Sequence, residues 1–117
     1  MPKAPSSLEF LPEAQADLEG IDEHNPDHAE RVLEKIADWE EKIGWGRVPQ
    51  KHLTYLTDSP AEYNFYRERV GNSGYRVIYE ISEDVMTVVA VLPKSDDTYD
   101  LSALARRASE GHGQGSE

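Results

Sequence analysis

Hydrophobic positions in the first part of the chain repeat with helical spacing after a short alternating stretch. Residues 7–10 alternate as a strand does. Two apolar stripes follow, and the pair Asn25-Pro26 between them is a helix-start signal. The first stripe consists of Leu11, Ala14, Leu18 and Ile21. The second ends at Gly44 and consists of Ala29, Val32, Leu33, Ile36, Trp39 and Ile43. Two successive helices that are each apolar on one side predict an antiparallel helical hairpin.

The period changes in the second half of the chain, where extended runs are separated by turn residues. Residues 45–61 are rich in Gly, Pro and turn residues and predict a loop, with an extended piece near 52–56. Strands are predicted near residues 62–70, 75–82 and 85–93, and a helical segment at 101–107. The pattern predicts an α+β domain: a helical hairpin packed on one face of a small, mainly antiparallel sheet. The expected element order is β-α-α-β-β-β with a short C-terminal helix.

The length of 117 residues fits one domain with a single modest core. We assign residues 7–108 to this domain, 1–6 to a flexible lead-in, and 109–117, which cannot bury apolar surface, to a disordered tail. The absence of cysteine excludes a disulfide framework and a thiolate metal site, and favours a cytoplasmic protein. The longest apolar run, 88–92, has the length of a strand, so neither a cleaved signal nor a membrane span is expected.

Three arginines gather in the predicted hairpin around the turn 71–74, whose Gly, Asn and Ser residues suit a tight loop. In this hairpin, residues whose numbers add to 145 face each other, so Arg69 opposes Arg76. Arg67 lies on the same side because side chains alternate along a strand. Facing like charges cost roughly 0.2–1 kcal/mol, which favours an anion between them, and phosphate is the obvious one. The residues alone leave a second interpretation open, in which the arginines are solvated and pair with neighbours such as Glu80.

Other residues near the hairpin extend this candidate site. Phe65 and Tyr63 are predicted on the face of the arginines, where they could stack on bases of unpaired RNA. Lys51, in the preceding loop, is a further RNA-binding candidate, whereas nothing beyond charge connects His52 beside it with RNA. The register also puts Glu68 on the helix-covered face, where a bulge or a position at the margin of the sheet would have to accommodate it. No metal site and no cofactor are expected, since the sequence contains no zinc signature and no phosphate-binding glycine loop.

The net charge of −11 is unevenly distributed. Residues 1–50 carry 5 Lys/Arg and 12 Asp/Glu, whereas residues 51–76 carry 4 and 3. An acidic balance normally argues against nucleic-acid binding. A cytoplasm at molar salt removes the conflict, because the Debye length there is about 3 Å and distant carboxylates no longer repel RNA. We therefore expect a halophilic source.

The hairpin and the residues after it resemble a known family. The run Ser73-Gly-Tyr-Arg-Val-Ile-Tyr79 is followed by an acidic turn, a valine-rich strand, Lys94 and Tyr99-Asp100. This pattern is similar to the RelE/ParE superfamily of toxins from type II toxin–antitoxin systems, and the RelE-like branch is favoured. The resemblance covers roughly residues 7–105, and its specific part is 66–100.

The resemblance implies an activity and a set of residues for it. In RelE-like toxins the uncovered face of the sheet enters the ribosomal A site and cuts messenger RNA without a metal or a cofactor. By resemblance, the catalytic residues are Arg67, Arg69, Arg76 and Tyr99. Lys94 is implied as RNA-binding, because Ser95 stands where well-known members carry a second arginine. Guanidinium groups would stabilise the charged phosphorane, and Tyr99 is the candidate for proton transfer because arginine stays protonated.

The resemblance also implies partners and leaves two further functions open. The implied partners are a cognate antitoxin, the ribosome and messenger RNA, and the antitoxin is expected to lay a helix over the molecule, displacing residues 101–107. A ParE-like toxin would instead inhibit DNA gyrase by binding, an alternative that Ser95 keeps open. A catalytically weakened homologue would serve mainly to bind its antitoxin.

Overall fold

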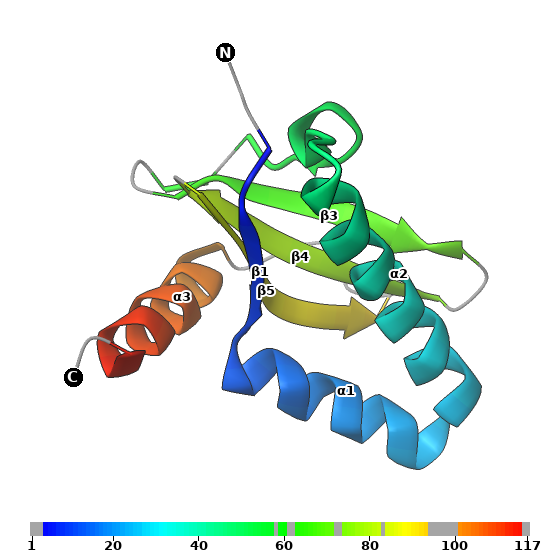
Figure 1. Cartoon of the computed structure of the whole chain (residues 1–117). Helices are drawn as coiled ribbons and strands as arrows, with labels where there is room; N and C mark the ends of the chain where they lie inside the picture. The colour runs from blue at the N-terminus through cyan, green and yellow to red at the C-terminus, as the bar shows by residue number, and fades with distance from the viewer. Residues whose placement is uncertain are drawn as a thin grey trace.

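The chain folds into an α+β domain, as the sequence pattern predicts (Figure 1). A computed structural model describes residues 4–57, 59–60, 63–71, 74–82, 84–93 and 101–115. The helices are α1 (Pro12–His24), α2 (Pro26–Gly44) and α3 (Leu101–Gly115), and a short 3-10 turn, η1, spans Pro49–Lys51. The strands are β1 (Ser7–Phe10), β2 (Thr54–Tyr55), β3 (Phe65–Val70), β4 (Tyr75–Ser82) and β5 (Val85–Pro93). The predicted order β-α-α-β-β-β with a C-terminal helix is confirmed, with β2 as a short additional strand in the predicted loop.

The five strands form one sheet in the order β1-β5-β4-β3-β2. β1 runs parallel to β5, and every other neighbouring pair is antiparallel. The hairpin register is confirmed, because Arg69 pairs with Arg76 and Val70 with Tyr75 across the β3–β4 turn. In that turn Gly74 has a φ of 80°, the left-handed conformation that glycine adopts without a steric penalty. The arginines of β3 and β4 therefore share one face of the sheet.

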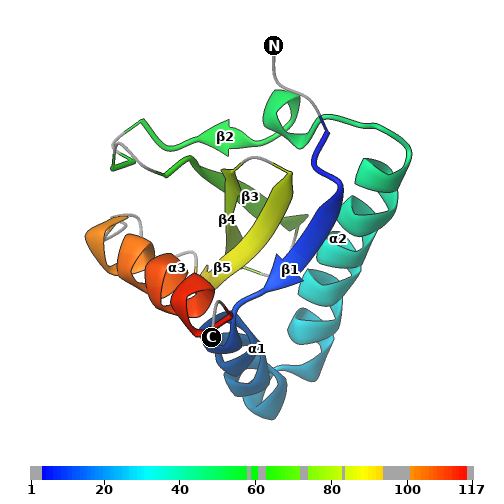
Figure 2. The ribbon, with the colours of Figure 1, turned by 60° about the vertical axis from the view of Figure 1, so that its left-hand side comes forward.

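Helices lie on both sides of this sheet, so the face that carries the arginines is not bare. In both views the sheet lies between α2 and α3 (Figures 1 and 2). The helical hairpin covers one face, and its buried stripe is Ala14, Leu18, Ile21, Ala29, Val32, Ile36, Trp39 and Ile43. On the arginine face, Ile78, Glu80 and Ala90 are buried, and so are Leu104 and Ala108 of α3. The prediction of an uncovered face thus holds only for the part nearest the β3–β4 turn.

Glu68 is accommodated on the helix-covered face by hydrogen bonds, without a bulge in β3. Its carboxylate accepts the Trp39 indole N–H at 2.8 Å and the Tyr79 hydroxyl at 2.9 Å. Burial raises the pKa of Tyr79 well above its usual value, and the negative charge of Glu68 raises it further. The phenol therefore stays protonated and keeps donating. The register shift in the sheet lies elsewhere, between Ile78 and Tyr79 opposite β5.

Both ends of the chain are more regular than the sequence pattern suggests. Pro5 is fully buried and the backbone N–H of Ser6 donates to the carbonyl of Asp84 at 2.8 Å, so the main chain is held to the sheet before β1 begins. At the other end, α3 continues past Arg107 to Gly115 and covers most of the stretch 109–117 for which disorder is expected. Leu33, a member of the second apolar stripe, also differs from the prediction, because 49% of its surface remains exposed.

Candidate nucleic-acid interface

The three hairpin arginines share a face but differ in how far they reach into solvent. Arg69 is exposed, Arg67 is half-buried and Arg76 retains 7% of its surface. Arg69 and Arg76 stand directly opposite each other, and Arg67 stands one row away, opposite Ile78. A bound anion can therefore reach Arg69 and Arg67, whereas Arg76, beside Arg69 in the next strand, has little exposed surface.

Arg67 and Arg69 open onto a cavity of about 490 Å³ at the edge of β3. Its lining consists of His52, Thr54, Arg67, Glu68 and Arg69. The Nε of Arg67 is buried there and has no hydrogen-bond partner among the described residues. An unmet buried donor costs about 1–3 kcal/mol, and more when it is charged. The accessible parts of the Arg67 and Arg69 guanidinium groups, beside the carboxylate of Glu68, are what this cavity offers to an acceptor from outside, such as a phosphate oxygen.

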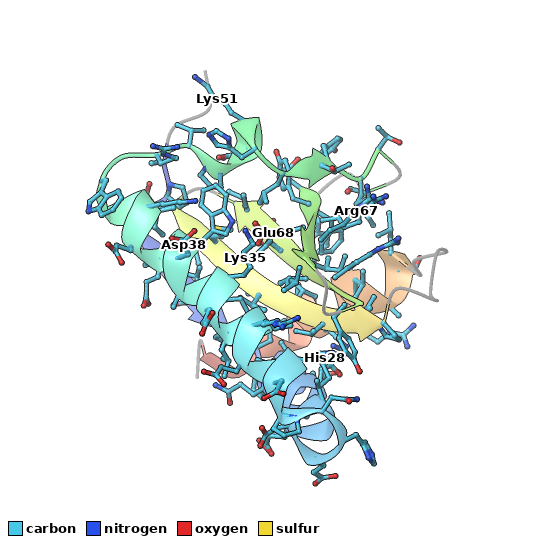
Figure 3. The ribbon with its side chains drawn as sticks, turned by 90° about the vertical axis from the view of Figure 1, so that its right-hand side faces the viewer. His28, Lys35, Asp38, Lys51, Arg67 and Glu68 are labelled. Atoms are coloured by element: carbon cyan, nitrogen blue, oxygen red, sulfur yellow. The ribbon has the colours of Figure 1, made fainter. Side chains whose placement is uncertain are left out.

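The strand that carries these arginines is fixed from its opposite face. Glu68 lies between Arg67 and Arg69 in β3 and points away from them toward α2, where Trp39 and Tyr79 bind it. Figure 3 shows Glu68 over the sheet beside α2 and Arg67 farther out at the edge. Because both anchors are buried side chains of α2 and β4, the backbone on either side of Glu68 is held in place. The spacing of the two arginines therefore follows from the packing of the core.

Two of the predicted RNA-binding residues lie elsewhere. Phe65 has no exposed surface and stacks on Tyr63 with ring centroids 5.7 Å apart and an interplanar angle of 9°. Phe65 therefore belongs to the core and cannot stack on a base, which corrects the sequence interpretation. Lys51 is exposed at the end of η1, well away from Arg67 (Figure 3).

Two other predicted site residues, Tyr99 and Lys94, lie outside the described residues, as does Ser95. The structure therefore brings together Arg67, Arg69 and Arg76 from the predicted set.

Sequence reasoning missed His52 and Thr54 as lining residues of the cavity. The signal was the strand β2, in which Thr54 pairs with Arg67 and Tyr55 with Tyr66. Because β2 has two residues, its period cannot be recognised in the sequence.

The flank of α2 carries charges of both signs. A groove of about 390 Å³ between α2 and the β3–β4 turn is lined by Arg31, Glu34, Lys35, Asp38, Val70 and Gly71. Within it, the hydrogen bond from Lys42 lowers the pKa of the Asp38 carboxyl, and the two groups are 2.8 Å apart. The hollow on the other side of α2 is different. It is lined by Phe10, Gln15, Leu18, Glu19, Asp22, Pro26, Ala29, Glu30 and Leu33, and has no basic residue.

Two further observations concern metal binding and membrane crossing in the described part of the chain. No three His, Cys, Asp or Glu side chains there are grouped so that they could hold a metal ion. None of its helices is both long enough and apolar enough to cross a membrane.

Comparisons with known proteins identify the family and the fold of the chain. The family model described as the ParE toxin of the type II toxin–antitoxin system parDE matches residues 8–98. The structure is similar to a chain in the crystal structure of the archaeal RelE–RelB complex from Pyrococcus horikoshii OT3, with a TM-score of 0.52. The two chains are 22% identical, and the match covers 75% of this chain and 93% of that one. No curated protein sequence matches the chain. At this identity the structural likeness shows the fold, a helical hairpin on a mainly antiparallel sheet.

Proposed function

This chain belongs to the ParE toxin family of type II toxin–antitoxin systems and has a RelE-like fold; from that premise we propose that it cleaves messenger RNA on the ribosome. The observation that supports the proposal is the cavity at the edge of β3, where Arg67 and Arg69 meet and the buried Nε of Arg67 has no acceptor among the described residues. In the cell the activity is silenced by an antitoxin, the partner that defines such systems.

The proposed chemistry needs three things from the site: proton removal, charge stabilisation and protonation of the leaving oxygen. A ribose 2′-hydroxyl attacks the adjacent phosphate, and the phosphorane that forms carries two negative charges. Arg67 and Arg69 supply fixed positive charge with a planar array of donors that matches phosphate oxygens. Arginine cannot take up or release the proton, because its guanidinium remains charged at any pH of interest. By resemblance, Tyr99 is the proposed partner for proton transfer.

The excess of acidic residues is compatible with RNA binding when the arginines act at contact distance. At molar salt the Debye length is about 3 Å, so carboxylates elsewhere on the surface are screened from a bound RNA while contact pairs are retained. This is the reason for the proposed halophilic source. The outer hollow of α1 and α2, with Glu19, Asp22 and Glu30 and no basic residue, would otherwise repel a nearby RNA.

The test is cleavage of a defined message by translating ribosomes, at 0.15 M and at 2 M KCl, with cut sites mapped by primer extension. We expect cleavage by the wild type and at least a hundredfold slower cleavage by Arg69→Ala. The matched control is Arg106→Ala, which removes an exposed arginine from α3. An intact message with the wild type at both salt concentrations would overturn the proposal.

A second candidate function is inhibition of DNA gyrase by binding, the activity that resemblance to ParE toxins implies, and the match to a ParE toxin family model is compatible with it. The burial of Arg76 also fits a site with fewer arginines available to RNA. The same protein preparation is therefore added to a gyrase supercoiling assay. Inhibited supercoiling together with an intact message would establish this alternative. If neither target is affected, the third interpretation, a homologue that mainly binds its antitoxin, remains.

A further inference from the structure

We propose that His52 is a further catalytic residue of this site and moves the proton that the arginines cannot move. The inference rests on the proposed cleavage of RNA and adds a named group to it. It starts from one observation: the cavity that contains Arg67 and Arg69 is also lined by His52, the only histidine in its lining.

The end of the η1 turn accounts for this position. Thr54 pairs with Arg67 and Tyr55 with Tyr66, so β2 leaves the edge of β3 beyond Arg67 unpaired. His52 comes two residues before β2 and has a φ of −117° and a ψ of −15°, so it is not part of the ladder. It lines the cavity at this unpaired edge together with Arg67, Glu68 and Arg69.

The backbone and the ring of His52 are both held. Its N–H donates to the carbonyl of Pro49 at 2.8 Å, which closes the η1 turn immediately before it. Its ring lies beside Trp39, with centroids 5.9 Å apart and the planes inclined by 43°. Trp39 is buried and donates its indole N–H to Glu68 at 2.8 Å. The imidazole is thus positioned by the same side chains that fix β3, while His52 itself remains exposed toward the cavity.

The chemistry of an imidazole suits proton transfer, a step for which the proposed function otherwise names only Tyr99. A histidine with an ordinary pKa of about 6.5 exchanges a proton near neutral pH, whereas arginine and an unperturbed tyrosine do not. In the proposed step, neutral His52 accepts the proton of the 2′-hydroxyl as the bond from O2′ to phosphorus forms. The bond from phosphorus to O5′ breaks, and the imidazolium or water gives a proton to O5′. The products are a 2′,3′-cyclic phosphate and a 5′-hydroxyl end, so no other reactant is needed.

The charged groups around His52 come from three segments of the chain. Lys51 precedes it, Arg67 and Arg69 line the same cavity from β3, and Glu68 is linked to it through Trp39. The neutral form is the one that accepts a proton from the 2′-hydroxyl. The cleavage rate should therefore fall on the acidic side as His52 becomes protonated, and this limb should be absent when His52 is replaced.

The experiment compares wild type, His52→Ala and His52→Gln in single-turnover cleavage of ribosome-bound message between pH 5 and 9. The control is His24→Ala, which replaces an exposed histidine at the end of α1. We expect both His52 variants to cleave roughly 10²–10⁴-fold more slowly, the range for loss of a general acid or base. We expect the acidic limb to disappear and added imidazole to restore part of the activity of His52→Ala. Binding of a message with a 2′-deoxyribose at the mapped cut site should be unchanged.

The outcomes separate this inference from the proposed function. Cleavage by His52→Ala at the wild-type rate, with the same pH profile, would overturn the inference and leave the proposed function standing. Equal losses of cleavage and of binding to the 2′-deoxy message would make His52 a binding residue and overturn its role in proton transfer. An intact message with the wild type would overturn both.

Discussion

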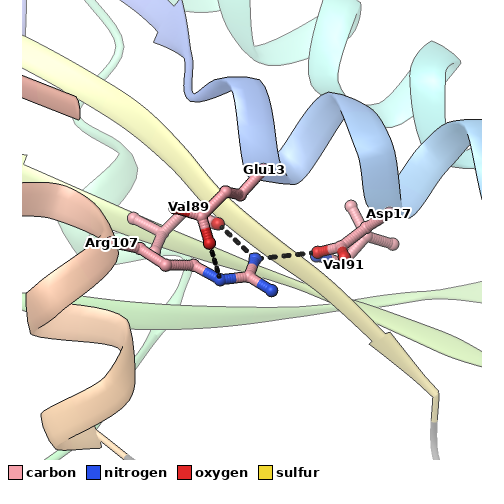
Figure 4. Close-up of polar contacts among 5 residues, drawn as sticks. All are labelled: Glu13, Asp17, Val89, Val91 and Arg107. Atoms are coloured by element: carbon pink, nitrogen blue, oxygen red, sulfur yellow. Dashed lines mark hydrogen bonds and ion pairs between the residues drawn. The ribbon is translucent and has the colours of Figure 1, made fainter. Parts of the chain in front are cut away.

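β5 and β3 each extend beyond the short edge strand that pairs with them, and the two unpaired stretches have different surroundings. On β5, β1 pairs with Val85–Val88, and the strand continues beyond it. There the N–H of Val91 donates to Asp17 at 3.1 Å and the carbonyl of Val89 accepts from Arg107 at 3.0 Å (Figure 4). Side chains from α1 and α3 thus occupy the positions that a neighbouring strand would use. On β3, past the two pairs with β2, the edge borders the cavity of Arg67 and Arg69.

The two arginines at these edges illustrate the difference. Arg107 donates to Asp17 and Val89 and forms an ion pair with Glu13 at 3.2 Å, so its guanidinium is bound on several sides. Arg67 keeps a buried Nε with no partner among the described residues. Arg107 is held by partners within the fold, which indicates a structural role, whereas Arg67 combines an unmet donor with a place in the lining of the cavity, which fits a ligand-binding role. Arg67 and Arg107 have the same side chain and the same charge, so the difference comes from their surroundings.

Of the changes at these two edges, the largest expected effect follows from replacing Arg67 with alanine. Loss of a donor that stabilises a transition-state charge typically costs about 10²–10³ in rate, and we expect a loss of that size in messenger-RNA cleavage. The free energy of unfolding should stay within about 0.5 kcal/mol of the wild type, because no described hydrogen bond of its Nε is removed. Urea denaturation and single-turnover cleavage measure the two quantities. A destabilised variant with a normal cleavage rate would reverse the assignment of this edge.

Replacing Arg107 with alanine should produce the opposite result. Asp17, Glu13 and the carbonyl of Val89 would all lose their shared partner, and we expect the free energy of unfolding to fall by about 1–3 kcal/mol. Hydrogen exchange should become faster at Val91, since Asp17 loses the cation that holds it. Cleavage per folded molecule should not change. Arg106→Ala is the control on the same helix, and an equal loss of stability in that variant would argue against a specific role for the β5 edge.

A third effect, smaller at neutral pH, tests the anchor beneath β3. Tyr79→Phe removes one of the two donors to Glu68 and should cost about 0.5–1.5 kcal/mol of unfolding free energy. Because the pKa of Tyr79 is raised in the folded protein, the native state holds this proton more tightly than the unfolded chain. Its contribution to stability is present below the normal tyrosine pKa and is lost as the pH rises through the raised value. Denaturation between pH 8 and 11 should therefore show a shallower alkaline loss for Tyr79→Phe. If the unfolding free energies of Tyr79→Phe and of the wild type fell in parallel as the pH rises, the raised pKa of Tyr79 would not contribute to stability.

The sequence predicted the fold and the hairpin register because both depend on local periodicity. The pairing of Arg69 with Arg76 follows from the turn alone. The burial of Phe65 did not follow, since strand alternation tells which face a side chain occupies and not what covers that face. Likewise, Glu68 looked misplaced because its partners, Trp39 and Tyr79, are distant in the chain. The sequence also did not place His52 at the cavity, because it lies between the η1 turn and β2, two elements too short to have a recognisable period.

The smallest expected effect separates edge capping from ion pairing as the role of Arg107. Asp38 and Lys42 also form an ion pair, at 2.8 Å, but they lie one turn apart on the surface of α2 with the Asp38 side chain 46% exposed. Such pairs contribute little because both charges remain hydrated. The pKa of Asp38 is lowered by its hydrogen bond to Lys42, so any contribution is present near neutral pH and is lost as the pH falls through that lowered value. Asp38→Asn should therefore have the same melting temperature as the wild type at pH 7. If it were destabilised as strongly as Arg107→Ala, ion pairing in general, rather than capping of the β5 edge, would explain the effect of Arg107.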